Sequence, residues 1–280
     1  MIFEIFKFII YSGLIVIISK YILVTNLRKL AENLNLKAKT VGNVAGYATS
    51  MPELLTVSVS SFSGLFATSV FNIISSNIIN LIQYLASIIL NKNKEILKNK
   101  AIRIDLILVL LTIIIPITLN VINVKFDLYM VAPFLILFIL FIFLNNKFHK
   151  MYLKDEDELI EKEIEKEEKE EKGNKIKTIK HIVYLIITGV LLFFIGDRLG
   201  IVLESLCNIF GIPELFIGIL LGFITSIPEL ITFFEAQKHH KNNENSRLGV
   251  IEATNNLLTS NILNLFLIQT VGIIIYNIIL

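Results

Sequence analysis

Long apolar runs dominate this sequence and constrain its fold more than any other feature. A helix that crosses a bilayer needs about 20 apolar residues, and eight ranges meet that need: 2–24, 38–61, 64–90, 103–124, 127–145, 181–204, 212–236 and 248–276. Hydrophobic residues make up 54% of the 280 residues, and the mean hydropathy is +0.71. Because backbone groups inside a bilayer must be hydrogen-bonded within the protein, we predict an all-α transmembrane protein.

Two of these runs contain the same motif. GNVAGYATSMPELLT (42–56) and GILLGFITSIPELIT (218–232) are identical at eight of fifteen positions. Each copy carries a carboxylate, Glu53 or Glu229, at membrane depth, where ionisable residues are expensive and are functional candidates. A second duplicated block follows each motif, FNIISSNIINL (71–81) and NNLLTSNILNL (255–265). The two glutamates are therefore predicted to share one site.

Positive charges predict the orientation of the helices. They cluster after the first, third, fifth and seventh predicted helices, whereas the loops between contain almost none. The positive-inside rule then places the N-terminus outside and the loop 147–180 in the cytoplasm. The two motifs consequently run in opposite directions, as in the inverted repeats of many transporters. We predict a first repeat at 1–146, a charged cytoplasmic loop at 147–180 and a second repeat at 181–280, with five and three helices and breaks in helices 2 and 7.

The motif residues are suited to cation binding. Pro52 and Pro228 lack an amide hydrogen and disturb the preceding turn, which frees carbonyls near Thr49 and Thr225. These carbonyls, with hydroxyls, asparagine amides and two carboxylates, form an all-oxygen set. Ca²⁺ takes 6–8 such ligands, and Na⁺ accepts similar ones. The set includes no His or Cys, which argues against zinc or copper.

The two carboxylates need compensation. An acid at a helix centre costs about 2.5–3.5 kcal/mol on insertion scales, and neither motif helix has a Lys or Arg beside its glutamate. One divalent cation, two monovalent cations or two protons would neutralise the pair. A purely structural role, in which Pro-Glu only kinks a helix, suits a single copy but not two copies with matched Ser-Asn partners.

Several classes of function lack support in the sequence. The net charge is +2 and the charges lie in loops, so nucleic-acid binding is not indicated. A single cysteine, Cys207, excludes an internal disulfide. We find no nucleophile–base arrangement typical of an enzyme, and no cofactor motif. The oligomeric state is not predicted.

At the duplicated motifs the chain resembles the cation/Ca²⁺ exchanger superfamily, and the sodium/calcium exchanger family in particular. The family's alpha repeats carry G-T-S-x-P-E-L followed by G-S-N-I-x-N/D, and both motifs are visible in each half. The resemblance implies an antiporter that exchanges Ca²⁺ for Na⁺ by alternating access in a prokaryotic plasma membrane. The ligand residues that it implies are Glu53, Glu229, Thr49, Thr225, Ser50, Ser226, Ser76, Ser260, Asn80, Asn264, Gly46 and Gly222.

The chain departs from the family pattern in three ways. Ala48 and Ile224 replace one motif glycine, and Ser75 and Thr259 replace another. Asn264 stands where many relatives have Asp, which limits the bare charge of the site to −2 and leaves H⁺ open as a counter-ion. The family usually has ten helices in a 5+5 arrangement, so two peripheral helices are expected to be missing. The alternatives are a H⁺/Ca²⁺ antiporter that uses the same glutamates and a non-transporting cation-binding membrane protein.

Overall fold

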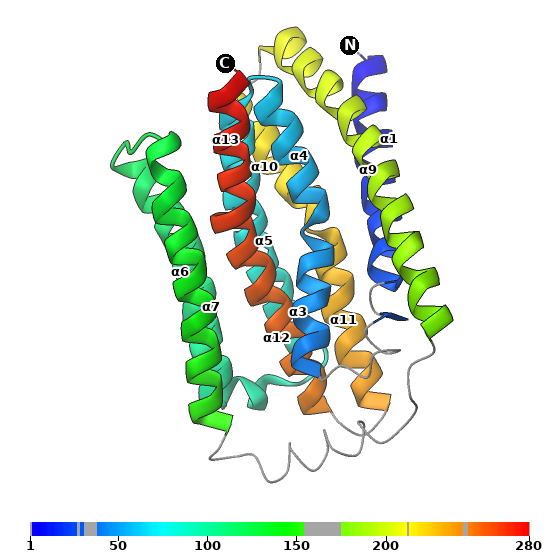
Figure 1. Cartoon of the computed structure of the whole chain (residues 1–280), viewed down its shortest axis with the longest axis vertical. Coiled ribbons are helices and arrows are strands. Elements are labelled where there is room, and N and C mark those ends of the chain that lie inside the picture. Colours follow the sequence, from blue (N-terminus) through cyan, green and yellow to red (C-terminus); the bar gives the residue numbers. More distant parts are fainter. Residues whose placement is uncertain are drawn as a thin grey trace.

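The protein is described by a computed structural model that covers residues 2–26, 29–30, 38–153, 175–211, 213–242 and 246–279. Within these ranges the regular structure is helical, which confirms the all-α prediction (Figure 1). Seven helical stretches in the described part are long and apolar enough to cross a membrane: Ile2–Leu23, Phe66–Leu90, Lys100–Val121, Leu128–Phe148, Thr178–Phe210, Glu214–Lys238 and Arg247–Ile279.

The one predicted range that is missing from these seven, 38–61, is also helical but is divided into two short helices. α3 (Ala38–Thr49) and α4 (Met51–Phe62) meet at Ser50, whose backbone has φ −80° and ψ −1°. α10 (Glu214–Thr225) and α11 (Ile227–Asn242) meet at Ser226, where φ is −79° and ψ is −2°. Both helices are therefore interrupted at the same position of the motif, as predicted for helices 2 and 7.

The second duplicated blocks, 71–81 and 255–265, which we call the Ser-Asn blocks, lie on two long helical segments. α5 (Phe66–Leu90) is a regular α-helix. Its counterpart begins as α12 (Ser246–Ile262), passes through the π-helical segment η4 (Leu263–Ile268) and ends as α13 (Gln269–Ile279). The range 248–276 thus forms one continuous helical stretch whose middle turn is wider than an α-helical turn.

These segments form the centre of the molecule. α10 packs along α5, and α3 packs along α12, while α4 contacts α5 and α13. In Figure 1, α3 and α4 run upward and α10 and α11 run downward, so the two motif segments are antiparallel. We call the end where α5 is followed by Lys92, Lys94 and Lys98 the lysine-rich end, and the end with the α4–α5 turn at Ser63–Leu65 the opposite end.

Two pairs of helices flank this centre. α6 (Lys100–Val121) and α7 (Val131–Leu153), joined through the short η3 (Leu128–Met130), pack on α12 and η4. On the other side, α1 (Ile2–Ile18) and its π-helical continuation η1 (Ser19–Val24) pack on α9 (Lys175–Phe210). A short η2 (Lys94–Lys98) links α5 to α6.

Both ends of the predicted loop 147–180 are helical. α7 continues to Leu153 and α9 begins at Lys175, whereas residues 154–174 lie outside the described part of the chain. α9 is 36 residues long, well beyond the predicted range 181–204. Charged side chains are tolerated in the parts of a helix that extend past the bilayer, so a hydropathy window ends before the helix does.

Burial separates the inner from the outer helices. Phe266 lies at the centre of an aromatic group, with ring centroids 5.9 Å from Phe134 and 4.9 Å from Phe141. Large apolar side chains such as Ile139 on α7 and Ile186 on α9 are exposed instead. Exposed apolar surface of this extent is unusual in a soluble protein and suits contact with lipid.

Candidate cation-binding site

The two motif glutamates lie in the interior of the bundle. Glu53 is in the first turn of α4 and Glu229 is in the first turn of α11, just after each helix interruption. Both side chains have no exposed surface. A helix N-terminus favours a negative charge, so the interruptions place each carboxylate where the backbone partly offsets its burial.

Each glutamate is held by a serine of the Ser-Asn block in its own half. Ser76 Oγ donates to Glu53 Oε1 at 2.7 Å, and Ser260 Oγ donates to Glu229 Oε1 at 3.0 Å. The same serines contact the other half, since Ser76 and Ser226 hydroxyls lie 2.9 Å apart and Ser50 Oγ donates to Ser260 Oγ at 2.9 Å. The two motifs therefore meet in one hydrogen-bonded cluster.

The motif threonines also reach across the halves. Thr49 Oγ1 donates to Asn256 Oδ1 at 3.3 Å, and Thr225 Oγ1 approaches Asn72 Oδ1 at 3.5 Å. Thr49 further interacts with Glu229, and Thr225 interacts with Glu53. Each carboxylate is thus bordered by a serine from its own half and a threonine from the other half.

Four further residues support the site although sequence reasoning did not include them. Asn72 Nδ2 donates to Thr56 Oγ1 at 2.7 Å, and Asn256 Nδ2 donates to Thr232 Oγ1 at 2.5 Å. These bonds fix Asn72 and Asn256 so that their oxygens face the motif threonines. The signal for them was present, because both asparagines and both threonines are identical between the two copies.

Asparagines join the two Ser-Asn helices directly. Asn77 Nδ2 donates to the Asn261 carbonyl at 3.2 Å, and Asn261 Nδ2 donates to the Asn77 carbonyl at 3.1 Å. Asn80 Nδ2 donates to Asn261 Oδ1 and Asn264 Nδ2 donates to Asn77 Oδ1, both at 3.1 Å. These bonds use the amide nitrogens of Asn80 and Asn264. The amide oxygens of the same two residues take no part in them.

Four buried oxygens of this cluster have no hydrogen-bond donor among the described residues. They are the second carboxylate oxygen of each glutamate, Glu53 Oε2 and Glu229 Oε2, and the amide oxygens of Asn80 and Asn264. Unsatisfied buried acceptors are rare and require an explanation. Oxygen acceptors that include two carboxylates match the preference of Ca²⁺ and Na⁺, and the described part of the chain holds no group of three or more His, Cys, Asp or Glu side chains.

Glycines allow the helices that carry these residues to approach closely. A Cβ atom on Gly46 would lie 2.9 Å from the Asn256 carbonyl oxygen, and one on Gly222 would lie 2.7 Å from the Asn72 carbonyl oxygen. The glycine carbonyls accept the amides of Ser50 and Ser226, each at 3.2 Å. Close packing of backbones is thus the observed role of Gly46 and Gly222, and their role as carbonyl ligands stays a prediction.

The family of the chain follows from its sequence profile. The profile of the sodium/calcium exchanger protein family matches residues 5–146 and 180–279, which is most of the chain. The chain belongs to this family. The family consists of transporters rather than enzymes, and with the apolar helices described above it identifies an integral membrane protein.

Solved structures with the same fold are also known. The sodium-calcium exchanger NCX_Mj, soaked with 10 mM Na⁺ and zero Ca²⁺, matches with 22% sequence identity and a TM-score of 0.53 over 98% of this chain and 84% of that chain. The same exchanger soaked with 2.5 mM Na⁺ and 10 mM Sr²⁺ gives 22% identity and a TM-score of 0.52, with 98% and 83% coverage. Among curated proteins, no sequence matches the chain.

This member of the sodium/calcium exchanger family differs between its halves at one site residue. Asn264 lies in the π-helical segment η4, whereas Asn80 lies within the regular helix α5. π-helical turns are rare and are often found at functional sites. The sequence does not predict this turn, because the residue types of Leu263–Ile268 suit an α-helix equally well.

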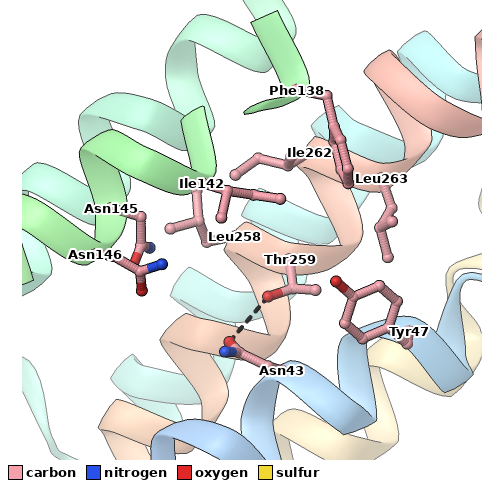
Figure 2. A pocket seen from close by; sticks show the side chains of 10 residues that line it. All are labelled: Asn43, Tyr47, Phe138, Ile142, Asn145, Asn146, Leu258, Thr259, Ile262 and Leu263. Atoms are coloured by element: carbon pink, nitrogen blue, oxygen red, sulfur yellow. Dashed lines mark hydrogen bonds between the residues drawn. The ribbon is translucent and has the colours of Figure 1, made fainter. Parts of the chain in front are cut away.

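A small cavity lies beside the site. It has a volume of about 90 Å³ and is lined by α3, α7, α12 and the start of η4, as Figure 2 shows. Thr259 Oγ1 donates to Asn43 Oδ1 at 3.0 Å at one wall, and Tyr47 forms another part of the lining. The glutamates do not line this cavity, so it is separate from the buried cluster.

Proposed function

We propose that this chain is an antiporter that exchanges Ca²⁺ for Na⁺ by alternating access at the Glu53–Glu229 cluster. The observation that carries the proposal is the set of four buried oxygens without donors, two from carboxylates and two from amides. Buried oxygens of this kind are the groups that a bound cation satisfies. Membership of the sodium/calcium exchanger protein family supports the same conclusion.

The proposed ligands extend to the rest of the motif residues. Glu53 and Glu229 supply charge, Asn80 and Asn264 supply neutral oxygens, and Ser76 and Ser260 hold the carboxylates by hydrogen bonds. We include Thr49, Thr225, Ser50 and Ser226, which lie in the same cluster, together with the carbonyls of Gly46 and Gly222. The ions are substrates, and the proposal requires no cofactor.

Charge balance provides the basis for exchange. Two carboxylates are neutralised equally by one Ca²⁺ or by two Na⁺, so the two cargos can replace each other without leaving uncompensated charge in the bilayer. A ligand can shift a conformational equilibrium only through differential affinity, and a filled, neutral site is easier to move across a low-dielectric barrier than a charged one. Exchange is therefore favoured over one-way transport, because the empty site keeps the charge of its two carboxylates and crosses the barrier less easily than the filled site.

The second candidate is H⁺/Ca²⁺ exchange at the same residues. It is favoured by Asn264, an amide where many relatives have Asp, because the site then holds two carboxylates and two protons neutralise it completely. Protons need no coordination shell, so this reading makes no use of the amide oxygens. We place it second for that reason.

The proposed arrangement in the membrane follows from the antiparallel motifs. The two halves act as inverted repeats, with the lysine-rich end in the cytoplasm of a prokaryotic cell and the opposite end outside. Lys92, Lys94 and Lys98 at the lysine-rich end support this orientation. Ca²⁺ would then leave the cell as Na⁺ enters.

Reconstitution tests the function and separates the candidates. Proteoliposomes loaded with Na⁺ or with acid should be diluted into ⁴⁵Ca²⁺, and uptake compared with liposomes that lack protein. We expect uptake driven by the outward Na⁺ gradient. Uptake driven by the H⁺ gradient alone would select the second candidate. The absence of uptake under both gradients would refute antiport and leave a non-transporting cation-binding protein.

A further inference from the structure

The two halves differ strongly in what lies next to the site. On α4, positions one and two turns beyond Glu53 are Val57 and the pair Ser60–Ser61. On α11, the same positions beyond Glu229 are Phe233 and the pair Ala236–Gln237. Because α4 and α11 run in opposite directions from the site (Figure 1), these residues lie on its two opposite sides.

On the side toward the opposite end, a thin aliphatic layer covers the site. Val57, Ile73 and Ile268 form a small buried cluster from α4, α5 and η4, with Leu54 packed against it. None of these side chains has a polar group. The layer thus consists of three buried aliphatic side chains with the partly buried Leu54 at its edge.

Beyond this layer lies a group of buried polar side chains. Ser60, Ser61 and Ser69 have almost no exposed surface, and their hydroxyls have no hydrogen-bond partner among the described residues. A Cβ atom on Gly272 of α13 would lie 2.8 Å from Val57 Cγ1 and 3.0 Å from both Ser61 Oγ and Ser69 Oγ, so these two hydroxyls converge directly beside the aliphatic layer. Only a glycine fits at this point, where α4, α5 and α13 meet.

Gln269 provides an independent observation at the same place. It is 1% exposed, and neither its amide oxygen nor its amide nitrogen has a partner in the described part of the chain. Gln269 precedes Gly272 by three residues, so the two lie on the same face of α13. A buried glutamine with both ends unsatisfied is destabilising in a dry environment. Ordered water removes that cost.

The side toward the lysine-rich end is closed by larger side chains. Phe233 and Tyr84 pack edge to face with ring centroids 5.8 Å apart, in the same apolar cluster as Leu257. The Tyr84 and Thr254 hydroxyls are hydrogen-bonded at 2.7 Å. This layer therefore combines aromatic packing with a hydrogen bond between α5 and α12.

A second layer on that side is also fully hydrogen-bonded. Gln237 Nε2 donates to Ser87 Oγ at 2.8 Å, and Gln237 Oε1 accepts from Asn93 Nδ2 at 3.0 Å. The glutamine thus has partners at both ends, unlike Gln269. Positions that hold hydroxyls in the first half, Ser60 and Ser69, hold Ala236 and Ala253 in the second half.

We propose that Ser60, Ser61, Ser69 and Gln269 line a hydrated vestibule that receives Na⁺ or Ca²⁺, separated from the Glu53–Glu229 site by the Val57–Ile73–Ile268 layer alone. The Phe233–Tyr84–Leu257 layer and Gln237 keep the other side shut in this conformation. Hydroxyl and amide oxygens replace part of the water around an entering cation, and the carboxylates beneath favour cations over anions. The inference rests on the proposed function for the identity of the ions.

Thiol labelling tests the vestibule without any transport measurement. In a Cys207→Ser background, the near-isosteric variants Ser61→Cys and Ser69→Cys are compared with Ala253→Cys, the counterpart of Ser69 in the second half. Each purified protein reacts with a trimethylammonium-ethyl methanethiosulfonate, and the mass shift of the intact chain is followed in time. Ser60→Cys, with Ala236→Cys as its control, replaces any variant that does not give a monodisperse protein.

The vestibule predicts that Ser61→Cys and Ser69→Cys react at least roughly tenfold faster than Ala253→Cys, the ratio produced by a difference of about 1.4 kcal/mol in the free energy of opening. It also predicts faster reaction with the cationic reagent than with its sulfonate analogue. Equal rates for Ser69→Cys and Ala253→Cys would overturn the vestibule, and equal rates for both reagents would overturn its cation preference. A wild-type protein that fails to transport would refute the proposed function and leave these rates unaffected.

Discussion

The two halves of this molecule are alike in the residues that form the site and unlike in the outer helices and layers that surround it. Ser76 holds Glu53 as Ser260 holds Glu229, and the helix breaks at Ser50 and Ser226 share their backbone angles. One position beyond the Ser-Asn blocks the likeness ends. Phe266 is fully buried under α7, whereas Ile82, at the same position of the first half, is 60% exposed. The comparison teaches that duplication is retained by the chemistry of the site and not by the surrounding scaffold.

The largest expected effect comes from breaking the likeness at the glutamates. Glu53→Gln and Glu229→Gln should each reduce ⁴⁵Ca²⁺ uptake by about a thousandfold, since one charge at about 4 Å contributes about 4 kcal/mol at an effective dielectric constant of 20. Uptake into proteoliposomes measures this.

The matched control for the glutamates is Glu95→Gln. Glu95 is exposed and forms a surface ion pair with Lys98, and such pairs contribute little. Uptake should stay at the wild-type rate. If only one of the two site variants lost activity, the glutamates would not form a shared site.

Equivalent substitutions outside the site should have unequal effects in the two halves. Phe266→Ala removes a ring that packs against Phe134 and Phe141, and it should lower the free energy of unfolding by about 3–5 kcal/mol. Ile82→Ala changes an exposed side chain and should stay within about 0.5 kcal/mol of wild type. Unfolding in lipid bicelles, followed by circular dichroism, compares the two. A similar loss of unfolding free energy in both variants would contradict the exposure of Ile82 and the difference between the halves.

The serines sharpen the comparison inside the site. Ser76→Ala and Ser260→Ala each remove a hydrogen bond to a charged group, which contributes about 1.5–3 kcal/mol. Ca²⁺ affinity should therefore fall roughly 10- to 100-fold in both variants, as measured by calorimetric titration. Ser58→Ala is the control, because Ser58 Oγ donates to the Leu54 carbonyl within its own helix. An unchanged affinity for either site variant would mean that the halves are not equivalent.

The smallest effect is expected at the glycines. Gly46→Ala and Gly222→Ala place a Cβ against the backbone of the opposite half, and such overpacking destabilises by about 1–3 kcal/mol. Gly13→Ala is the control, since a Cβ there meets nothing within 4 Å. Thermal unfolding in detergent gives the order. A stability of Gly222→Ala equal to that of Gly13→Ala would contradict the close approach of α10 and α5.

The sequence predicts the helices and the pairing of the motifs, because apolar runs, helix breaks and identical residues are visible along the chain. It does not predict the ends of α9, since the lysines that precede the span continue the helix. It also does not predict the π-helical turn at Asn264, whose residue types suit an α-helix equally well. Hydrogen bonds such as Ser50 to Ser260 depend on how two distant helices pack, which no local pattern specifies.

The central claim is that Glu53 and Glu229 form one cation site rather than two. Equilibrium dialysis of the purified protein against ⁴⁵Ca²⁺ tests it by counting the ions bound to each chain at saturation. The account predicts one Ca²⁺ for the wild-type chain and none for Glu53→Gln or for Glu229→Gln. A variant that keeps one Ca²⁺ with wild-type affinity would contradict it.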